Sequence, residues 1–171
     1  MYLTGAGKGI GKAIAKRFLA EEAAGVAILE WDLALAEATA KELDPTGERV
    51  IAIRCNVADS EMVKAAVDQV VATFGRIDVL INNAGITRDK IFHKMTDDDW
   101  HMVIDVNLNG VYNLCKYVLP LMREQESGAV VNLSSTSVMG NPGQATTPLP
   151  RLLCRALPVP WLRSWAARTF V

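Results

Sequence analysis

The sequence predicts an α/β fold, a doubly wound parallel sheet with helices on both faces, from three observations. Short β-branched apolar runs alternate with longer amphipathic stretches along the 171 residues. The apolar runs are nearly uninterrupted, which is typical of strands covered on both faces, as in a parallel sheet. With 50% hydrophobic and 22% charged residues, a chain of this length suits one globular domain and leaves no room for two well-cored ones.

Five strands are expected. Residues 1–4 precede the first glycine and leave only a stub for the first and central strand. The other four expected strands cover residues 26–29, 50–53, 77–81 and 129–133. All four are rich in valine, isoleucine and leucine, and turn-forming residues separate them from the helical stretches.

Four helices are expected between these strands, over residues 10–24, 33–43, 60–74 and 97–123. Ser60 with Glu61 opens the third, and Thr96 with Asp99 has the spacing of a capping box for the fourth. Seven residues of this last helix share one apolar face: Trp100, Val103, Ile104, Leu108, Val111, Cys115 and Val118. Strands and helices that alternate in this way predict right-handed βαβ units and a Rossmann-like sheet.

Composition excludes several classes of protein. The net charge of −1 provides no broad basic surface for nucleic acid, and no apolar run approaches the roughly 20 residues of a membrane helix. Three cysteines without a CxxC pair predict reduced thiols in a cytoplasmic protein, and no zinc site or disulfide framework. His93 and His101 lack a set of spaced ligands, so no metal is expected. We expect a protein that binds a small molecule.

A glycine-rich turn, Thr4-Gly-Ala-Gly-Lys-Gly-Ile-Gly11, joins the first strand to the first helix. Its glycines would let a pyrophosphate approach the helix N-terminus, where N–H groups and the helix dipole favour negative charge. A Walker A loop is excluded because Ala6 and Ala13 stand where that loop needs glycine and serine or threonine. The spacing TGxxxGxG differs from GxGxxG, so a plain glycine-rich turn is the alternative.

Glu30 ends the second strand, 25 residues after Gly5. An acidic residue there commonly accepts hydrogen bonds from the adenosine ribose and would repel the 2′-phosphate of NADP. Lys8 offers a cation in the phosphate turn and favours NADP. NAD is weakly favoured over NADP on these grounds. The alternative is that both side chains are solvated surface charges.

Three further motifs carry a resemblance: Asn82-Asn83-Ala84-Gly85 after the fourth strand, Asn107 in the long helix, and Asn132-Leu-Ser134-Ser135 after the fifth. With the glycine turn, they resemble the short-chain dehydrogenase/reductase family over about residues 3–144. The segments 85–89 and 139–144, with Trp100, resemble its β-ketoacyl thioester reductases.

The resemblance implies NAD(P)-dependent reduction of a β-keto group on a small carbonyl or acyl-thioester substrate. It implies catalytic roles for Ser135, which would hydrogen-bond the substrate carbonyl, and for Asn107, which would hold a relay water. A surface asparagine is the alternative for Asn107. The implied cofactor contacts are Gly5, Lys8, Gly9, Ile10, Gly11, Glu30, Asn56, Val57, Asn83, Ala84 and Gly85. Asn56 replaces the family's usual aspartate.

The family's catalytic tyrosine and lysine are absent from their expected places, which hold Thr147 and Arg151. Tyr112 and Lys116 have the Tyr-x-x-x-Lys spacing, but on an amphipathic helix this spacing is attributed to chance. The chain is therefore expected to be impaired. A catalytically inactive nucleotide-binding module, or pseudoenzyme, is the alternative, and a non-functional gene product is a third.

Residues 145–171 differ in composition from residues 1–144, with four prolines, four arginines and no acidic residue. Codons for Thr146–Arg151 can be written ACT-ACT-CCG-CTG-CCA-AGG, and another frame of these bases encodes Tyr-Ser-Ala-Ala-Lys. We therefore predict a Rossmann domain over residues 1–144 and a frameshifted tail over 145–171. An unusual in-frame C-terminus is the alternative.

Two consequences would follow from a frameshifted tail. The apolar face around Val111 and Val118 would lose part of its cover, because the family uses its catalytic helix and the long helix in a subunit interface. The homo-oligomer that is usual in the family is therefore doubtful for this chain.

Overall fold

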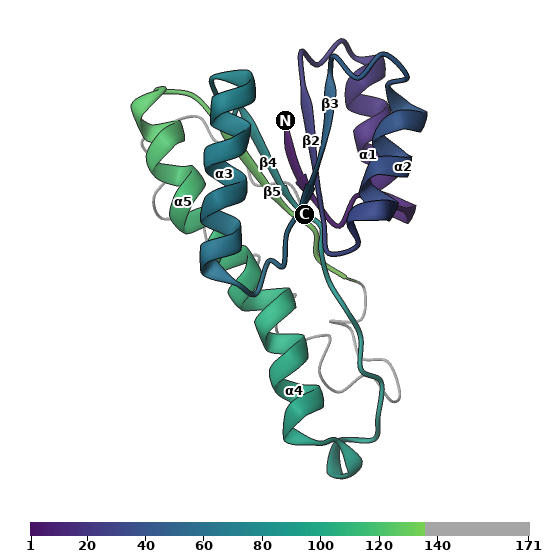
Figure 1. Cartoon of the computed structure of the whole chain (residues 1–171). Helices are drawn as coiled ribbons and strands as arrows, with labels where there is room; N and C mark the ends of the chain where they lie inside the picture. The colour runs from purple at the N-terminus through teal and green to yellow at the C-terminus, as the bar shows by residue number, and fades with distance from the viewer. Residues whose placement is uncertain (136–171) are drawn as a thin grey trace.

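The computed structural model describes residues 1–135, which form a five-stranded parallel sheet with helices on both faces (Figure 1). The strands are β1 (Tyr2–Thr4), β2 (Val26–Glu30), β3 (Val50–Arg54), β4 (Val79–Asn82) and β5 (Ala129–Asn132). Their order is β3-β2-β1-β4-β5, so the chain reverses direction across the sheet between β1 and β4. The expected doubly wound fold is confirmed. Residues 139–144, Thr147, Arg151 and the 145–171 tail lie outside the described residues.

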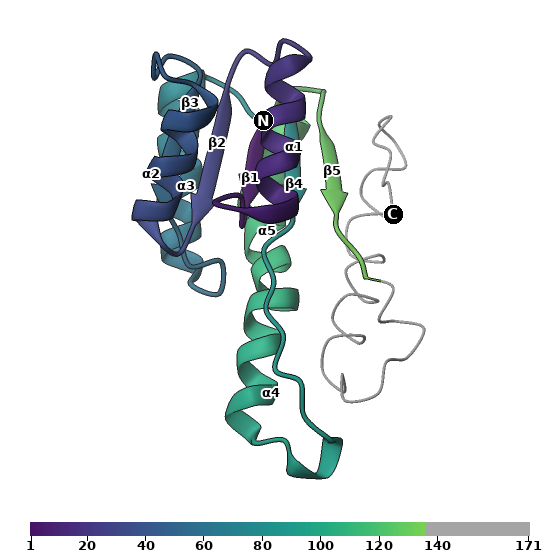
Figure 2. The same cartoon turned by 90° about the vertical axis from the view of Figure 1, so that its right-hand side faces the viewer.

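Two layers of helices cover the sheet. Helices α1 (Gly9–Ala20) and α2 (Leu33–Leu43) lie on one face, and α3 (Ser60–Phe74) and α5 (Gly110–Glu124) on the other (Figures 1 and 2). The 3₁₀ turn η1 (Phe92–Lys94) and helix α4 (Asp97–Ile104) extend beyond the sheet layers. Helix α2 begins after Asp32, whose carboxylate accepts the Leu35 N–H.

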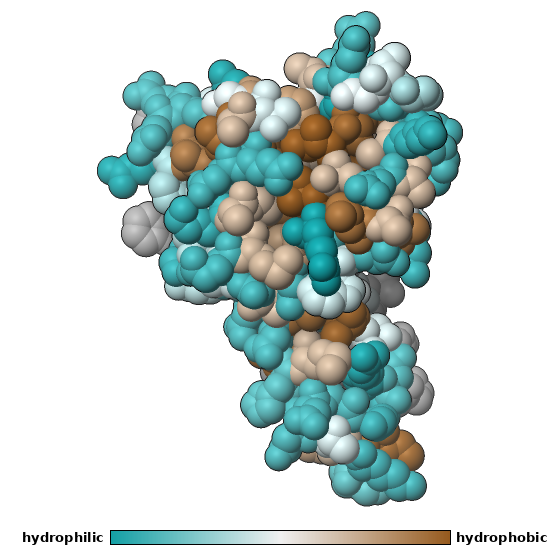
Figure 3. Space-filling view, viewed as in Figure 1, coloured by the Kyte–Doolittle hydropathy of each residue, from teal (hydrophilic) through white to brown (hydrophobic). Residues whose placement is uncertain are grey.

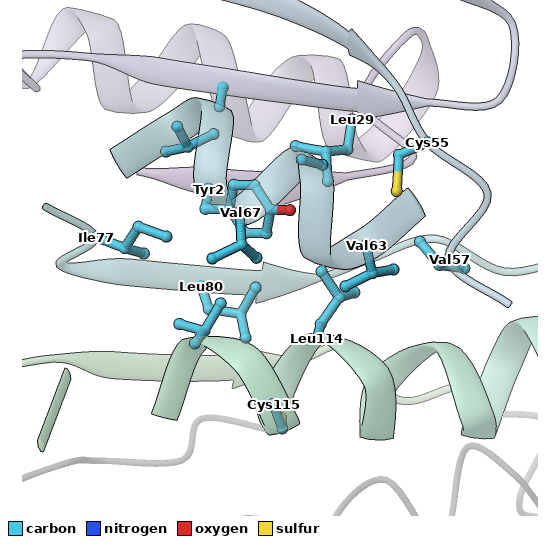
Figure 4. Packing of buried hydrophobic residues seen from close by; sticks show 14 of the residues in the cluster. Tyr2, Leu29, Cys55, Val57, Val63, Val67, Ile77, Leu80, Leu114 and Cys115 are labelled. Atoms are coloured by element: carbon cyan, nitrogen blue, oxygen red, sulfur yellow. The ribbon is translucent and has the colours of Figure 1, made fainter. Parts of the chain in front are cut away.

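Alternating strand residues fill two apolar cores. Leu3 and Ile28 pack with Ala15 and Ala36 of α1 and α2. On the opposite face, strand residues meet α3 and α5, and Figure 4 shows the side chains that are labelled there: Tyr2, Leu29, Cys55, Val57, Val63, Val67, Ile77, Leu80, Leu114 and Cys115. Because a strand points successive side chains to opposite faces, the short β1 still contributes to both cores.

The first helix is shorter than expected. It ends at Ala20, not at residue 24, because the next residues turn into a C-terminal cap. The Glu22 backbone has φ 60°, and the Ala23 N–H donates to the Phe18 carbonyl at 3.0 Å. This is the hydrogen bond of a Schellman motif, here with glutamate in the left-handed position that glycine usually takes.

The helix expected over residues 97–123 is not continuous. Its predicted capping box is confirmed at Thr96 and Asp99, but the π-helical segment η2 (Asp105–Asn109) separates α4 from α5. A π turn inserts a residue into the helical repeat and rotates the faces on either side of it. At the start of α3, Asp59 caps the helix by accepting the Glu61 and Met62 N–H groups, so Ser60 is the first helical residue.

The expectation that the face around Val111 and Val118 loses cover is wrong. These side chains are 4% and 0% exposed, within the core shared by α3, α5 and the sheet. Among the described residues, no helix is long and apolar enough to cross a membrane. Figure 3 shows apolar residues reaching the surface between α3 and α2, where the edge strand β3 lies, with hydrophilic residues around them.

Candidate functional site

The carboxyl ends of the five strands bring the predicted site residues to one edge of the sheet. The glycine turn follows β1, Glu30 ends β2, Asn56 follows β3, Asn83 follows β4 and Ser135 follows β5. In open α/β sheets this edge, at the point where strand order reverses, is where ligands bind. Here the reversal falls between β1 and β4.

Thr4 ties the end of β1 to the segment after β4. Its hydroxyl accepts the Asn83 and Ala84 N–H groups at 3.1 and 3.0 Å and lies 3.4 Å from the Ile81 carbonyl. The Asn83 side-chain amide donates back to the Thr4 and Gly5 carbonyls at 2.9 and 2.8 Å. These reciprocal bonds hold the glycine turn against Asn83 and Ala84.

Gly11 and Gly5 are needed because the backbone is crowded where the turn meets α1. A Cβ on Gly11 would lie 2.5 Å from the Gly5 carbonyl oxygen and 2.7 Å from the Asn83 amide nitrogen. A Cβ on Gly5 would lie 2.8 Å from Ala84 Cα. Neither position can hold a side chain without moving the backbone or the Asn83 amide that bonds to it.

The N-terminus of α1 is built differently from those of its neighbours. Asp32, Asp59 and Thr96 cap α2, α3 and α4 through their side chains, whereas Lys8 makes no capping bond to α1. Gly9 has φ +57°, with nothing within 4 Å of where its Cβ would be. Ile10 is 67% exposed. No side chain within residues 1–135 therefore accepts from the first N–H groups of α1, and a diphosphate could accept from them.

Glu30 contacts the glycine turn directly. Its carboxylate accepts the Gly7 N–H at 3.2 Å and the Trp31 N–H at 3.0 Å. On the other side of Gly7, the Thr39 hydroxyl of α2 donates to the Gly7 carbonyl at 2.6 Å. These bonds fix the Glu30 carboxylate beside the glycine turn.

Trp31 and Arg54 form a cation–π pair next to Glu30. The Arg54 guanidinium lies 5.0 Å from the centroid of the indole ring, and the Trp31 side chain is 58% exposed. Glu30 and Arg54 are register partners on β2 and β3, yet no ion pair joins them within the described part of the chain.

Asn56 and Val57 hold the loop after β3 in place. The Asn56 side-chain oxygen accepts the Ala58 N–H at 3.1 Å, and the Val57 carbonyl accepts from the Asn113 side chain at 2.9 Å. Val57 packs so closely against α5 that a Cβ on Gly110 would lie 2.7 Å from it. Both residues lie at the carboxyl edge, and neither has a hydrogen bond to the glycine turn among the described contacts.

Asn107 is buried, so the surface-asparagine alternative is wrong. It is 1% exposed within the π-helical segment η2, its side-chain oxygen accepts the Ile86 N–H at 2.8 Å, and its amide donates to the Ile86 carbonyl at 2.9 Å. This pair of bonds fixes the segment that follows Gly85. Ser135 lies three residues beyond the end of β5, and Asn82 and Asn132 join the last two strands through a side-chain bond of 2.7 Å.

The tyrosines of the described region are Tyr2, Tyr112 and Tyr117. Tyr2 is fully buried, and burial raises its pKa, the opposite of what a proton donor at neutral pH needs. The Tyr117 hydroxyl bonds to Ser60 at 2.9 Å. Tyr112 is 55% exposed, and the Lys116 ammonium lies 5.1 Å from the Tyr117 ring centroid. The ring contact of Lys116 is thus with Tyr117, and the attribution of the Tyr112–Lys116 spacing to chance stays a prediction.

No group of three or more potential metal ligands occurs within residues 1–135. The Cys55 and Cys115 side chains are buried. Burial raises the pKa of Cys55 to about 12, with a smaller contribution from Asp59, so this thiol stays protonated and unreactive.

Sequence reasoning missed several contacts that shape the site. Gly7 and Thr39 connect the turn to Glu30 and α2, and Trp31 positions Arg54. The position of Thr4 immediately before the first glycine is a signal that could have pointed to its bonds with Asn83 and Ala84. The side chain of Thr39 offered no such signal, because its partner lies 32 residues away.

Comparison with known proteins places the chain in a family. Residues 1–146 match the model of the short chain dehydrogenase family. The chain is 48% identical over 145 residues to the 3-oxoacyl-(acyl-carrier-protein) reductase FabG of Staphylococcus aureus, which covers 84% of this chain and 58% of that protein. It is 39% identical over 169 residues to FabG of Thermotoga maritima, covering 97% of this chain and 68% of that protein.

A solved structure is similar in fold. It is the crystal structure of 3-ketoacyl-(acyl-carrier-protein) reductase from Brucella melitensis complexed with NADH, with a TM-score of 0.91 and 28% identity. The match covers 98% of this chain and 71% of that one. The chain thus spans only 58% of the length of the S. aureus protein. From the match over residues 1–146 and the identity to these reductases, we conclude that this chain belongs to the short chain dehydrogenase family.

Proposed function

We propose that the carboxyl edge of the sheet binds a nicotinamide dinucleotide and that the chain derives from an NAD(P)-dependent β-ketoacyl reductase. The observation that carries the proposal is the uncapped N-terminus of α1 beside a glycine turn that is fixed by Thr4 and Asn83. The residues that would contact the cofactor are Gly5, Lys8, Gly9, Ile10, Gly11, Glu30, Asn56, Val57, Asn83, Ala84 and Gly85.

The geometry fits a diphosphate at the turn. No side chain of the described residues caps the α1 N–H groups, and the open space at Gly9 lets a ligand approach the backbone. Glu30, 23 residues from its Gly7 partner, supplies a carboxylate for the ribose hydroxyls. The NADH complex of the Brucella reductase supports this class of cofactor. NAD is favoured because the Glu30 charge would repel a 2′-phosphate.

The proposed substrate is a β-ketoacyl thioester, by similarity to the acyl-carrier-protein reductases. The cofactor would supply the hydride for the keto carbon. Ser135 would donate a hydrogen bond to the carbonyl oxygen on which charge develops. Asn107 would hold a water of the proton relay, while its side chain keeps Ile86 in place beside the site.

A nucleotide-binding module without catalysis is the second candidate. It is favoured by Thr147 and Arg151, which stand where the family has tyrosine and lysine. We propose a frameshift near Ala145 as the cause. The end of the family match at residue 146 supports this boundary, whereas the alignment to the Thermotoga protein continues across 169 residues. Sequencing the DNA across codons 140–171 tests it, and an alternate frame without Tyr-x-x-x-Lys would refute it.

Two assays separate the candidates. Titration of the protein with NADH, followed by nicotinamide fluorescence, is expected to give saturable binding. Oxidation of NADH in the presence of acetoacetyl-CoA is expected to be far slower than is typical of the family. The absence of saturable binding would contradict the proposed site, and rapid turnover would contradict the impairment.

The remaining expectations are proposals as well. We propose a cytoplasmic compartment because the three cysteines of the sequence include no CxxC pair. We propose no role for nucleic acid or membrane, on the basis of the net charge of −1. We propose that this chain does not form the homo-oligomer that is usual in the family. Sedimentation velocity, which measures the mass of the particle in solution, tests this.

A further inference from the structure

The β2 and β3 end of the site contains one negative and one positive side chain, and within residues 1–135 no ion pair joins them. Glu30 and Arg54 are direct register partners in neighbouring parallel strands. Instead of pairing with Glu30, the Arg54 guanidinium lies over the Trp31 indole at 5.0 Å. The positive charge is therefore placed over the face of the Trp31 ring.

The Glu30 carboxylate is fixed from two sides. One oxygen accepts the Gly7 N–H of the glycine turn, and the other accepts the Trp31 N–H. Both partners are backbone groups, so substitution of a side chain does not remove them. Glu30 is thus held at the turn as a carboxylate with no ion-pair partner among the described residues, and the same residue, Trp31, provides one anchor and contacts Arg54 through its ring.

We propose that the Trp31–Arg54 pair determines cofactor choice in this chain, by keeping Arg54 from compensating Glu30. The inference rests on the proposed function. With Arg54 held on the indole ring, the Glu30 charge acts in full on the adenosine ribose, and the site prefers a free 2′-hydroxyl over a 2′-phosphate. Without the ring, Arg54 can reach Glu30 or the 2′-phosphate itself, and either contact favours NADP.

A substitution of Trp31 can change the position of the Arg54 guanidinium, because the Trp31 side chain is exposed and not part of the core. A cation–π contact at an exposed site is weak, so loss of the ring releases Arg54 at little cost to folding. The free energy of a charge–charge contact near a protein surface is comparable to that of the cation–π contact or larger. The redirected guanidinium can therefore change the preference for NADH over NADPH measurably. Trp31 is therefore a specificity-determining residue that acts through Arg54.

The test measures dissociation constants of NADH and NADPH by isothermal titration, with no turnover required. The wild type is expected to bind NADH at least tenfold more tightly than NADPH. Trp31→Ala is expected to reduce that ratio by about tenfold, and Trp31→Phe, which keeps a ring beneath the guanidinium, is expected to preserve it. The double variant Trp31→Ala/Arg54→Gln is expected to restore the wild-type ratio.

The outcomes distinguish this inference from the function on which it rests. A wild type that binds neither dinucleotide overturns both. A wild type that binds NADH, with a ratio unchanged in Trp31→Ala, overturns the inference alone. A Trp31→Ala ratio that stays lowered after Arg54→Gln also overturns it, because the ring would then act without the arginine. Equal thermal unfolding midpoints of the variants confirm that the ratio does not report on folding.

Discussion

The two halves of the candidate site differ in how firmly they are held. On the β1 and β4 side, Thr4, Gly5, Gly11 and Asn83 are joined by reciprocal bonds and by contacts with no room for a methyl group. On the β2 and β3 side, Trp31 and Arg54 are exposed and held by one ring contact. Glu30 joins the halves through Gly7.

The difference matches what each half would bind. A diphosphate is common to all nicotinamide dinucleotides, so a fixed backbone turn suits it and loses little entropy on binding. The ribose 2′-position is what distinguishes NAD from NADP, and a few exposed side chains suffice to discriminate there. Substitutions in the first half are therefore expected to affect folding and binding together, and those in the second half to affect selectivity.

Gly11→Ala is expected to have the largest effect. Its Cβ would lie 2.5 Å from the Gly5 carbonyl oxygen, so the turn must move and the Asn83 bond must lengthen. Overpacking of this kind costs about 3 kcal/mol of unfolding free energy. Urea unfolding monitored by circular dichroism measures this loss, and NADH titration is expected to show no binding. A fully stable variant that binds NADH normally would show that the β1 and β4 side of the site can move to accept a methyl group.

Thr4→Val is expected to have the next largest effect, because it keeps the shape and removes the acceptor of two amide bonds. Leaving such groups without a partner costs about 2 kcal/mol. Thr4→Ser, which keeps the hydroxyl, is the matched control and is expected to retain most of the stability. The urea concentrations at the unfolding midpoints of the two variants measure this difference. If both variants lost the same unfolding free energy, the effect would come from packing and not from the hydroxyl.

Gly9→Ala and Gly47→Ala form a matched pair. Both glycines have a positive φ, +57° and +73°, and nothing within 4 Å of the added Cβ. Each variant is expected to lose about 1 kcal/mol, the cost of a left-handed backbone in a residue with a side chain. Only Gly9→Ala is expected to weaken NADH binding in a calorimetric titration, since Gly47 lies between α2 and β3. Equal affinities would place the diphosphate elsewhere.

The smallest expected effect is on the pH dependence of folding stability, through Asp44, which lies between α2 and β3. Its carboxylate accepts from the Thr46 hydroxyl and from the Arg49 and Val50 N–H groups, and these bonds lower its pKa to about 2. A lowered pKa means that the contribution to stability is present above about pH 4 and is lost as the pH falls toward 2. Asp44→Asn is expected to flatten this part of the pH–stability curve. An unchanged curve would show that the Asp44 carboxylate does not contribute to the pH dependence of stability.

The sequence predicted the strands and the turn because their signals are local. Buried β-branched runs and a TGxxxGxG spacing need no knowledge of distant partners, and Glu30 and Asn83 followed from the parallel order. The end of α1 at Ala20 and the π turn at Asn107 were not predicted, because they depend on a glutamate in a left-handed position and on a bond to Ile86. The Arg54–Trp31 contact likewise arises only when β2 and β3 pair.

The central claim is that the backbone at the start of α1 binds the cofactor diphosphate. Nitrogen-15 NMR of the wild type during NADH titration measures this directly, because it follows each backbone amide separately. The Gly9, Ile10 and Gly11 amide signals are expected to shift with the same dissociation constant that fluorescence gives, while the Gly47 amide stays in place. Saturable NADH binding that leaves the amides of residues 9–11 unmoved would contradict the claim.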